Sequence, residues 1–317
     1  MTMPADSPHP VPQWQTLARP DADIEWCRWP TDHATPTGGI LIAHGASEHA
    51  ARYSRVAGIL NDAGWDVYGI DHRGHGRTAA EHGAPGVARP GGWDAMVDDI
   101  IAVTDLARDG SDGPFVLFGH SMGSLLGQRV CQLAGDRFDA VVLSGTSGSL
   151  DGADDLAALL RSIEEAEGHE QPSALFAGMF AGFNEPFAAE VDSPSGFEWL
   201  SRDAAEVAVY VADPWCGGDL SNGFVTDMIT GMAAMWSSGA EDAIPRALPV
   251  LLIAGDRDPV GDFGASVRAL HERYVDAGIA DAELVLYPDA RHELLNETNR
   301  DEVHRDLLAW LARIAAH

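Results

Sequence analysis

Short apolar runs alternate with helical patterns along most of this chain, and this alternation limits its fold more than any other feature. The apolar runs predict strands at residues 39–43, 65–70, 115–118, 140–144, 249–254 and 282–287. Apolar residues at helical spacing predict helices at residues 50–61, 94–108, 121–134, 263–276 and 301–314. Strands that alternate with helices form parallel sheets, and strands that are apolar throughout are covered on both faces. We therefore predict an α/β fold with a mostly parallel central sheet flanked by helices.

The alternation stops over residues 146–245, which are rich in helical patterns and poor in β-branched clusters. The simplest interpretation is an inserted helical cap over the carboxyl ends of the strands, where open α/β sheets bind their ligands. We expect residues 1–145 to form the first part of the core, with a loosely held Pro-rich arm at residues 1–20, and residues 246–317 to form the second part.

Two apolar stripes lie at helical spacing within the predicted cap. Such stripes usually belong to a core, but they could also line a pocket for an acyl chain, and the sequence leaves both interpretations open. Their residues are Leu175, Phe176, Met179, Phe180 and Phe183 in the first, and Phe224, Val225, Met228, Ile229, Met232, Met235 and Trp236 in the second.

The chain is strongly acidic, and this excludes several classes of function. It has 49 Asp and Glu against 20 basic residues, all of them Arg, which gives a net charge of −29. A field of this sign repels nucleic acids and anionic lipid surfaces. Without lysine, Schiff-base chemistry and a P-loop lysine are also excluded.

The chain shows no leader, membrane or disulfide pattern. Its N-terminal residues lack the basic stretch and the following apolar stretch that are typical of a signal peptide. No apolar run has the length of a transmembrane helix. We expect a cytoplasmic protein that contacts lipid aggregates at most transiently; its oligomeric state is not predicted. The three cysteines are few and far apart, so we expect no disulfide framework.

Several histidines cluster in two predicted loops, but their spacings fit no defined metal site, and His-Gly turns explain them more simply. We therefore expect no metal and no cofactor. These histidines are His44, His49, His72, His75 and His82.

Residues 118–124 read FGHSMGS, with a predicted strand before them and a predicted helix after them. A serine between a strand and a helix can sit on a strained turn that exposes its hydroxyl as a nucleophile. Gly119 and Gly123 would remove side chains that collide across such a turn. The alternative is a Gly-rich connection that carries Ser121 by chance.

A serine nucleophile needs a base and an acid that orients the base, each after a later strand. His292 follows the strand at 282–287, whereas the other histidines of this region lie in predicted helices or at the terminus. Asp256 and Asp258 both follow the strand at 249–254, and we favour Asp258 as the acid. The other aspartate is then expected to cap a turn.

The oxyanion of an acyl-transfer reaction needs two backbone donors. Met122 N–H, directly after the serine, is one candidate. The loop after the first predicted strand should supply the second, and Ala46 N–H is our choice.

The stretches LIAHGASEHAARY (41–53), GIDHRGHGRT (69–78), FGHSMGS, GDRDPVG (255–261) and YPDARHELLNE (287–297) together resemble the monoacylglycerol lipase and lysophospholipase branch of the α/β-hydrolases. The resemblance covers roughly residues 25–145 and 246–317. It implies the α/β-hydrolase fold with a mobile helical cap. The resemblance implies that Ser121 is the nucleophile, Asp258 the acid and His292 the base. It also implies that Ala46 and Met122 supply the oxyanion donors.

The resemblance also implies a serine ester hydrolase that acts on a small acyl ester, with monoacylglycerol as the expected substrate. Glu48 and Arg52, four residues apart, could be a helix-surface ion pair or, as the family suggests, could bind a polar head group. A short-chain carboxylesterase or thioesterase, a lysophospholipase, and a non-catalytic binder on the same fold are the alternatives.

Overall fold

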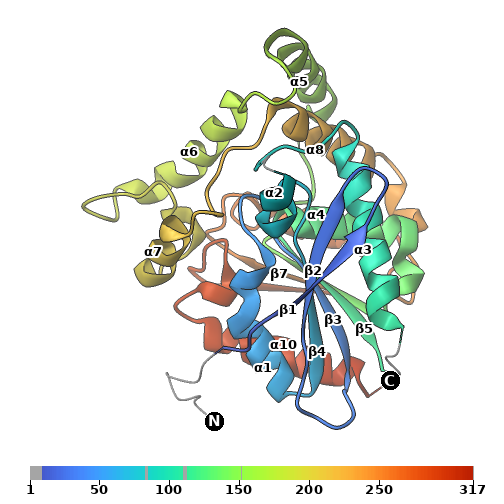
Figure 1. Cartoon of the computed structure of the whole chain (residues 1–317). Coiled ribbons are helices and arrows are strands. Elements are labelled where there is room, and N and C mark those ends of the chain that lie inside the picture. Colours follow the sequence, from blue (N-terminus) through green and yellow to red (C-terminus); the bar gives the residue numbers. More distant parts are fainter. Residues whose placement is uncertain (1–8, 83–84, 110–112, 151, 317) are drawn as a thin grey trace.

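A computed structural model of the chain describes residues 9–82, 85–109, 113–150 and 152–316. One mixed sheet of eight strands forms its centre (Figure 1). In chain order these strands are β1 (Gln13–Ala18), β2 (Asp23–Trp29), β3 (Gly38–Ala43), β4 (Trp65–Ile70), β5 (Phe115–His120), β6 (Ala140–Ser144), β7 (Val250–Gly255) and β8 (Ala282–Tyr287). Their order in the sheet is β1-β2-β4-β3-β5-β6-β7-β8, with β1 and β2 antiparallel to their neighbours and the rest parallel.

Helices cover both faces of this sheet. The helices are α1 (Ser54–Asp62), α2 (Gly76–His82), α3 (Gly92–Arg108), α4 (Met122–Ala134), α5 (Ala153–Glu167), α6 (Ala174–Ala188), α7 (Ala204–Ala212), α8 (Asn222–Met235), α9 (Ala265–Asp276) and α10 (Arg300–Ile314). The chain also has short 3-10 turns at Ala50–Tyr53, Gly135–Arg137, Glu198–Leu200, Ala240–Ala243 and Leu294–Asn296.

Every residue of β3 to β7 is buried, because alternate side chains enter the two cores on opposite faces of the sheet. Leu41 and Leu117 pack in the core shared with α3, α4, α8 and α9. Ile40 and Phe118 pack in the core shared with α1 and α10. The predicted α/β fold with a mostly parallel sheet is therefore confirmed.

The N-terminal segment differs from the prediction. Residues 13–18 of the expected loose arm form edge strand β1, which pairs with β2, a strand that the sequence analysis also missed. The prolines suggested a linker, but none of them lies within β1, and an edge strand tolerates prolines at its ends. Residues 1–8 of the expected arm lie outside the described residues.

Helices α5 to α8 lie between β6 and β7 in the chain, and α5, α6 and α7 project beyond the sheet (Figure 1). Helix α8 buries Phe224, Met228 and Met235 in the same core as α3 and α4. A smaller cluster joins Phe187 of α6 to Trp199 and Tyr210. The stripe on α8 is thus core, whereas the stripe on α6 is partly exposed, with Met179 among its exposed residues.

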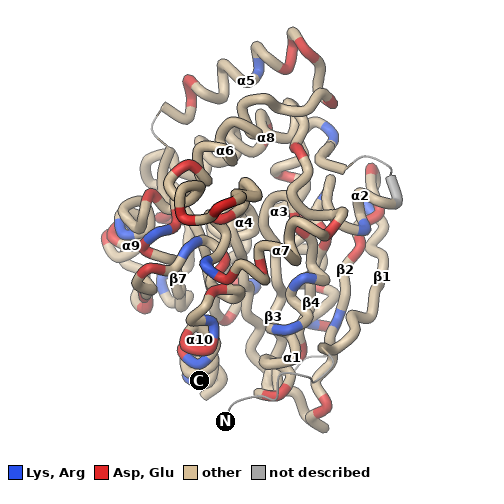
Figure 2. Tube along the Cα trace, turned by 90° about the vertical axis from the view of Figure 1, so that its left-hand side faces the viewer, with Lys and Arg blue, Asp and Glu red and all other residues tan. Residues whose placement is uncertain are grey.

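Acidic residues occur in many parts of the trace, including α5 and α10, with arginines scattered among them (Figure 2). Among the described residues, no helix combines the length and the apolar character that crossing a bilayer requires.

Candidate active site

Ser121 occupies the turn between β5 and α4 in a conformation that residues other than glycine rarely adopt. Its backbone angles are φ 51° and ψ −121°. Three hydrogen bonds hold the turn: Ser121 N–H donates to Ser144 O at 2.9 Å, and Ser121 O accepts from the N–H and the hydroxyl of Ser124 at 2.8 and 2.6 Å. The strained strand-turn-helix geometry that the sequence predicted is therefore present.

Close approach of the backbone makes the two flanking glycines necessary. A Cβ on Gly123 would lie 2.1 Å from Ala43 O, and one on Gly119 would lie 2.5 Å from Gly123 O. Such distances are far below van der Waals contact. The G-x-S-x-G pattern is thus required by how tightly α4 returns across the ends of β3 and β5.

Asp258 and His292 meet in the interior although 34 positions separate them. His292 Nδ1 lies 2.9 Å from Asp258 Oδ2, and both side chains are buried. The second carboxylate oxygen, Oδ1, accepts from Val260 N–H at 2.9 Å. Asp256 is exposed, and its Oδ1 instead accepts from Asp289 N–H at 2.7 Å. The structure therefore places Asp258 beside the histidine and gives Asp256 a turn-capping bond.

Three interactions set the protonation of His292. Burial alone would lower the pKa of His292, but the carboxylate of Asp258 and its hydrogen bond outweigh burial and raise that pKa. With Nδ1–H donating to Asp258, Nε2 carries the free lone pair. Nε2 is buried and has no hydrogen-bond partner among the described residues. This nitrogen is thus available to take a proton.

Ser121 and His292 line one pocket together with Ala46. Gly45 and Gly145 allow the close packing, because a Cβ on Gly45 would lie 2.9 Å from Ser121 Cβ and one on Gly145 would lie 3.0 Å from His292 Cε1. The apolar part of the lining comes from Phe180, Trp199, Leu200 and Tyr210. Phe180 belongs to the α6 stripe.

Both predicted oxyanion donors lie beside the serine in the fold. Met122 is the first residue of α4, whose first N–H groups have no partner within the helix, and its side chain is buried in the core. Ala46 N–H has no backbone acceptor among the described residues. Ser47, with φ 56°, anchors this loop: its carbonyl accepts from Gly217 N–H at 2.9 Å and from Tyr210 Oη at 2.8 Å.

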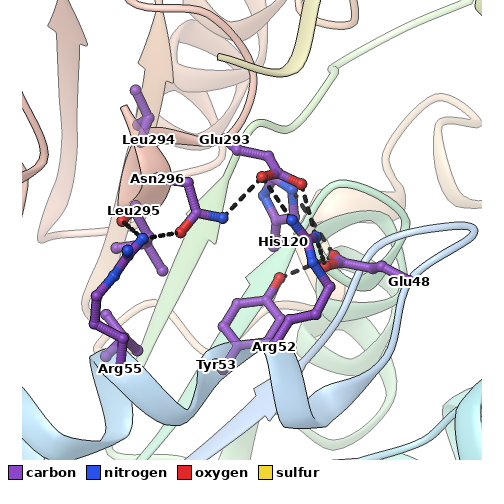
Figure 3. A pocket seen from close by; sticks show the side chains of 10 residues that line it. Glu48, Arg52, Tyr53, Arg55, His120, Glu293, Leu294, Leu295 and Asn296 are labelled. Atoms are coloured by element: carbon purple, nitrogen blue, oxygen red, sulfur yellow. Dashed lines mark hydrogen bonds and ion pairs between the residues drawn. The ribbon is translucent and has the colours of Figure 1, made fainter. Parts of the chain in front are cut away.

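Glu48 and Arg52 are not a helix-surface pair, so that interpretation is wrong. Glu48 is buried, and its Oε1 accepts from Gly45 N–H at 2.6 Å and from Tyr53 Oη at 2.9 Å. Arg52 donates to Glu48 at 2.5 Å and to both oxygens of Glu293 at 2.7 and 2.9 Å. Figure 3 shows the guanidinium between the two carboxylates. Glu48 and Arg52 therefore belong to a buried ion-pair network beside the pocket and not to an exposed helix surface.

Glu293 is a site residue that the sequence analysis missed. It directly follows His292, but its partner Arg52 lies 241 positions away, so no local pattern could reveal the pairing. Although burial raises the pKa of a carboxyl group, the Arg52 guanidinium outweighs it and holds the pKa of Glu293 below its usual range. The ring of His120 packs against that of His292 at a tilt, with the ring centroids 4.8 Å apart. Burial together with His292 lowers the pKa of His120 to about 4.

The loop histidines divide into separate environments. His44 packs against His72 and His75, with ring centroids 4.4 and 5.3 Å apart. Burial lowers the pKa of His72 to about 3 and that of His75 to about 4, so these rings are neutral near pH 7. The side chain of His82 lies outside the described residues.

The mostly parallel sheet, the strained serine turn and the pocket beside it are those of an α/β-hydrolase. The family described as serine aminopeptidase S33 (Hydrolase_4) matches residues 34–299. The chain therefore belongs to this family, and the predicted resemblance to its monoacylglycerol lipase-like members is confirmed.

Relatives and solved structures agree with this assignment over nearly the whole chain. A monoacylglycerol lipase of Mycolicibacterium smegmatis is 28% identical over 89% of this chain and 90% of its own. A monoglyceride lipase of Mus musculus is 28% identical over 98% and 97%. Two structures superpose with a TM-score of 0.86: a lipase in an open form, at 30% identity over 97% and 100% of the two chains, and a thermostable carboxyl esterase from Bacillus coagulans with glycerol, at 25% over 96% and 99%. The chain is an ester-hydrolysing α/β-hydrolase.

Proposed function

We propose that this enzyme hydrolyses the carboxylic ester of single-chain lipids, with monoacylglycerol as the preferred substrate. The observation that carries the proposal is the buried Asp258–His292 pair, whose free Nε2 shares a pocket with the strained Ser121. A serine hydroxyl is a weak nucleophile until a base takes its proton. This pocket brings the hydroxyl and the base together.

In the proposed mechanism His292 Nε2 accepts the proton of Ser121 as Oγ attacks the ester carbonyl. The N–H groups of Ala46 and Met122 stabilise the oxyanion. Protonated His292, steadied by Asp258, gives its proton to the departing alcohol. It then takes a proton from the water that cleaves the acyl-enzyme and restores Ser121. No cofactor takes part.

The lining of the pocket supports a substrate with an apolar tail and a hydroxylated alcohol. Phe180, Trp199 and Leu200 offer an apolar wall for an acyl chain. Glu48 lines the same pocket and can hydrogen-bond glycerol hydroxyls, and its partner Arg52 lines a second pocket that shares Glu48 and Glu293 with the first. A neutral head group also suits a chain of net charge −29 better than an anionic one. We further propose that residues 146–245, which supply this apolar wall, act as the cap of the core formed by residues 1–145 and 246–317.

Turnover of a panel of esters tests this proposal. The panel holds monoolein, a zwitterionic lysophospholipid, a thioester, and p-nitrophenyl esters from acetate to palmitate, with Ser121→Ala as the control. We expect monoolein and medium-to-long p-nitrophenyl esters to give the highest kcat/KM, and the variant to be inactive on all. A sharp preference for acetate would favour a short-chain esterase, and activity retained by Ser121→Ala would overturn the mechanism.

A further inference from the structure

Outside the pocket, the described residues contain one group of three side chains whose donor atoms could hold a metal ion. It comprises His49, Asp213 and Cys216, and the three donor atoms lie within 4.8 Å of one another. His49 Nε2 lies 2.9 Å from Asp213 Oδ2. Imidazole, carboxylate and thiolate are the ligands that zinc takes in proteins.

The spacing of the group fits a cation of this kind. A tetrahedral zinc ion with bonds of about 2.0–2.3 Å keeps its ligand atoms about 3.5 Å apart, so small side-chain rotations would close the group around it. Asp213 and Cys216 are three positions apart on one turn, in which Cys216 N–H donates to Asp213 O at 3.1 Å. Such a turn presents two ligands to the same side, as paired ligands with two residues between them do in zinc sites.

The backbone around the group holds it in place before any ion binds. Ser47, two residues before His49, donates its hydroxyl to Gly218 O at 2.7 Å and accepts from Gly217 N–H at 2.9 Å. Asp213 Oδ1 accepts from Trp215 N–H at 2.9 Å, which orients the carboxylate. Outer hydrogen bonds of this kind position metal ligands in known sites.

The surrounding charge favours a cation. Arg52, whose charge acts on both Asp213 and Cys216, is already bound by two carboxylates, those of Glu48 and Glu293. Asp213 adds a further negative charge, and the net charge of the whole chain is −29. A divalent ion would thus enter a region of negative potential.

We propose that His49, Asp213 and Cys216 form a binding site for zinc or a similar divalent cation. The bound ion would link the turn at residues 213–218 to the loop that carries Ala46. Binding replaces the Cys216 S–H bond with a sulfur–metal bond and releases that proton to the solvent. It also replaces the hydrogen bond from His49 Nε2–H to Asp213 with a nitrogen–metal bond, and the imidazole proton moves to Nδ1. Three protein ligands leave the fourth position to water. His49 Nδ1 has no acceptor among the described residues, so the affinity should lie about 10–100-fold below that of a site with a complete outer shell. This site is independent of the proposed ester substrate.

Equilibrium dialysis of the full chain against zinc chloride tests the proposal, with Cys216→Ser and Asp213→Asn as site variants. His33→Gln, which removes an exposed histidine elsewhere, is the matched control. We expect one zinc per wild-type chain, the same in His33→Gln, and a loss of at least about tenfold in affinity in both site variants. No saturable binding by wild type, or unchanged binding by Cys216→Ser, would overturn the site.

Cobalt provides a second readout that does not depend on the variants folding. Cobalt bound by wild type should show the near-ultraviolet charge-transfer band of a thiolate ligand, because the other two cysteines, Cys27 and Cys131, are buried away from this group. Zinc should also protect Cys216 from alkylation by iodoacetamide. A cobalt spectrum without the thiolate band, or alkylation unaffected by zinc, would refute cysteine ligation.

Discussion

Replacing Asp258 by asparagine changes a single buried atom, and the structure predicts a large effect on catalysis. The carboxylate accepts from two donors, Val260 N–H through Oδ1 and His292 Nδ1–H through Oδ2, both at 2.9 Å. An amide has only one acceptor oxygen. If that oxygen stays on Val260, the amide N–H₂ faces Nδ1 and favours the tautomer with the proton on Nε2, which cannot act as a base. If it turns to His292, two N–H donors face each other at Val260.

The second arrangement leaves Val260 N–H without an acceptor, which costs about 1–3 kcal/mol of stability, whereas the first keeps both hydrogen bonds and changes the tautomer of His292. The effect on catalysis should be larger. The equivalent change in a serine protease lowers kcat about 10⁴-fold, which corresponds to about 5.4 kcal/mol in the activation barrier. We expect a loss of this size in kcat for Asp258→Asn, with little change in KM.

Steady-state hydrolysis of a p-nitrophenyl ester measures this loss, and urea unfolding confirms that the variant is folded. Asp256→Asn is the matched control, because Asp256 is exposed and an asparagine oxygen can still accept from Asp289 N–H. We expect the control to keep wild-type activity. If Asp258→Asn retained activity within about tenfold of wild type, or if Asp256→Asn were the impaired variant, the assignment of the acid would be wrong.

Three further predictions concern pH and packing. Because His292 must be neutral to act and its pKa is raised, kcat/KM should fall with acid through a midpoint above about 6.5; a midpoint below 6 would contradict the assignment of the base. Gly123→Ala places a Cβ 2.1 Å from Ala43 O and should lower the urea unfolding free energy by at least about 2 kcal/mol, whereas an unchanged midpoint would refute the tight turn. Burial lowers the pKa values of His72 and His75, so the stability that their neutral rings give above about pH 6.5 is lost as the pH falls. We expect the free energy of unfolding to drop by roughly 1–2 kcal/mol for each ring between pH 7 and 5. Urea unfolding at the two pH values measures this drop, and equal stability would contradict burial of neutral rings.

The sequence was informative wherever function depends on strand ends. Ser121, Asp258 and His292 each follow a predicted strand, and the carboxyl ends of parallel strands meet at one edge of the sheet. Order along the chain therefore predicts proximity in space, without any knowledge of the loops. Both Asp256 and Asp258 follow the same strand, so the choice of Asp258 rested on its position further into the loop, and the family resemblance agreed with it.

The missed features depend on contacts between distant segments. Arg52 pairs with Glu293 across 241 positions, and His49 meets Asp213 across 164. Both pairings depend on how the chain folds back outside the strand–helix alternation, and no periodic pattern encodes that path. The N-terminal strand β1 was missed for a different reason, because prolines on either side hid a short edge strand.

Covalent labelling can show directly whether Ser121 is the nucleophile. Wild type and Ser121→Ala are treated with a fluorophosphonate, digested at arginine, and mapped by mass spectrometry over the peptide 109–129. We predict one adduct, on Ser121, in wild type, together with complete loss of esterase activity, and no adduct in the variant. Wild-type protein that hydrolyses esters yet carries no adduct on Ser121, or equal labelling of the variant, would show that Ser121 is not the nucleophile.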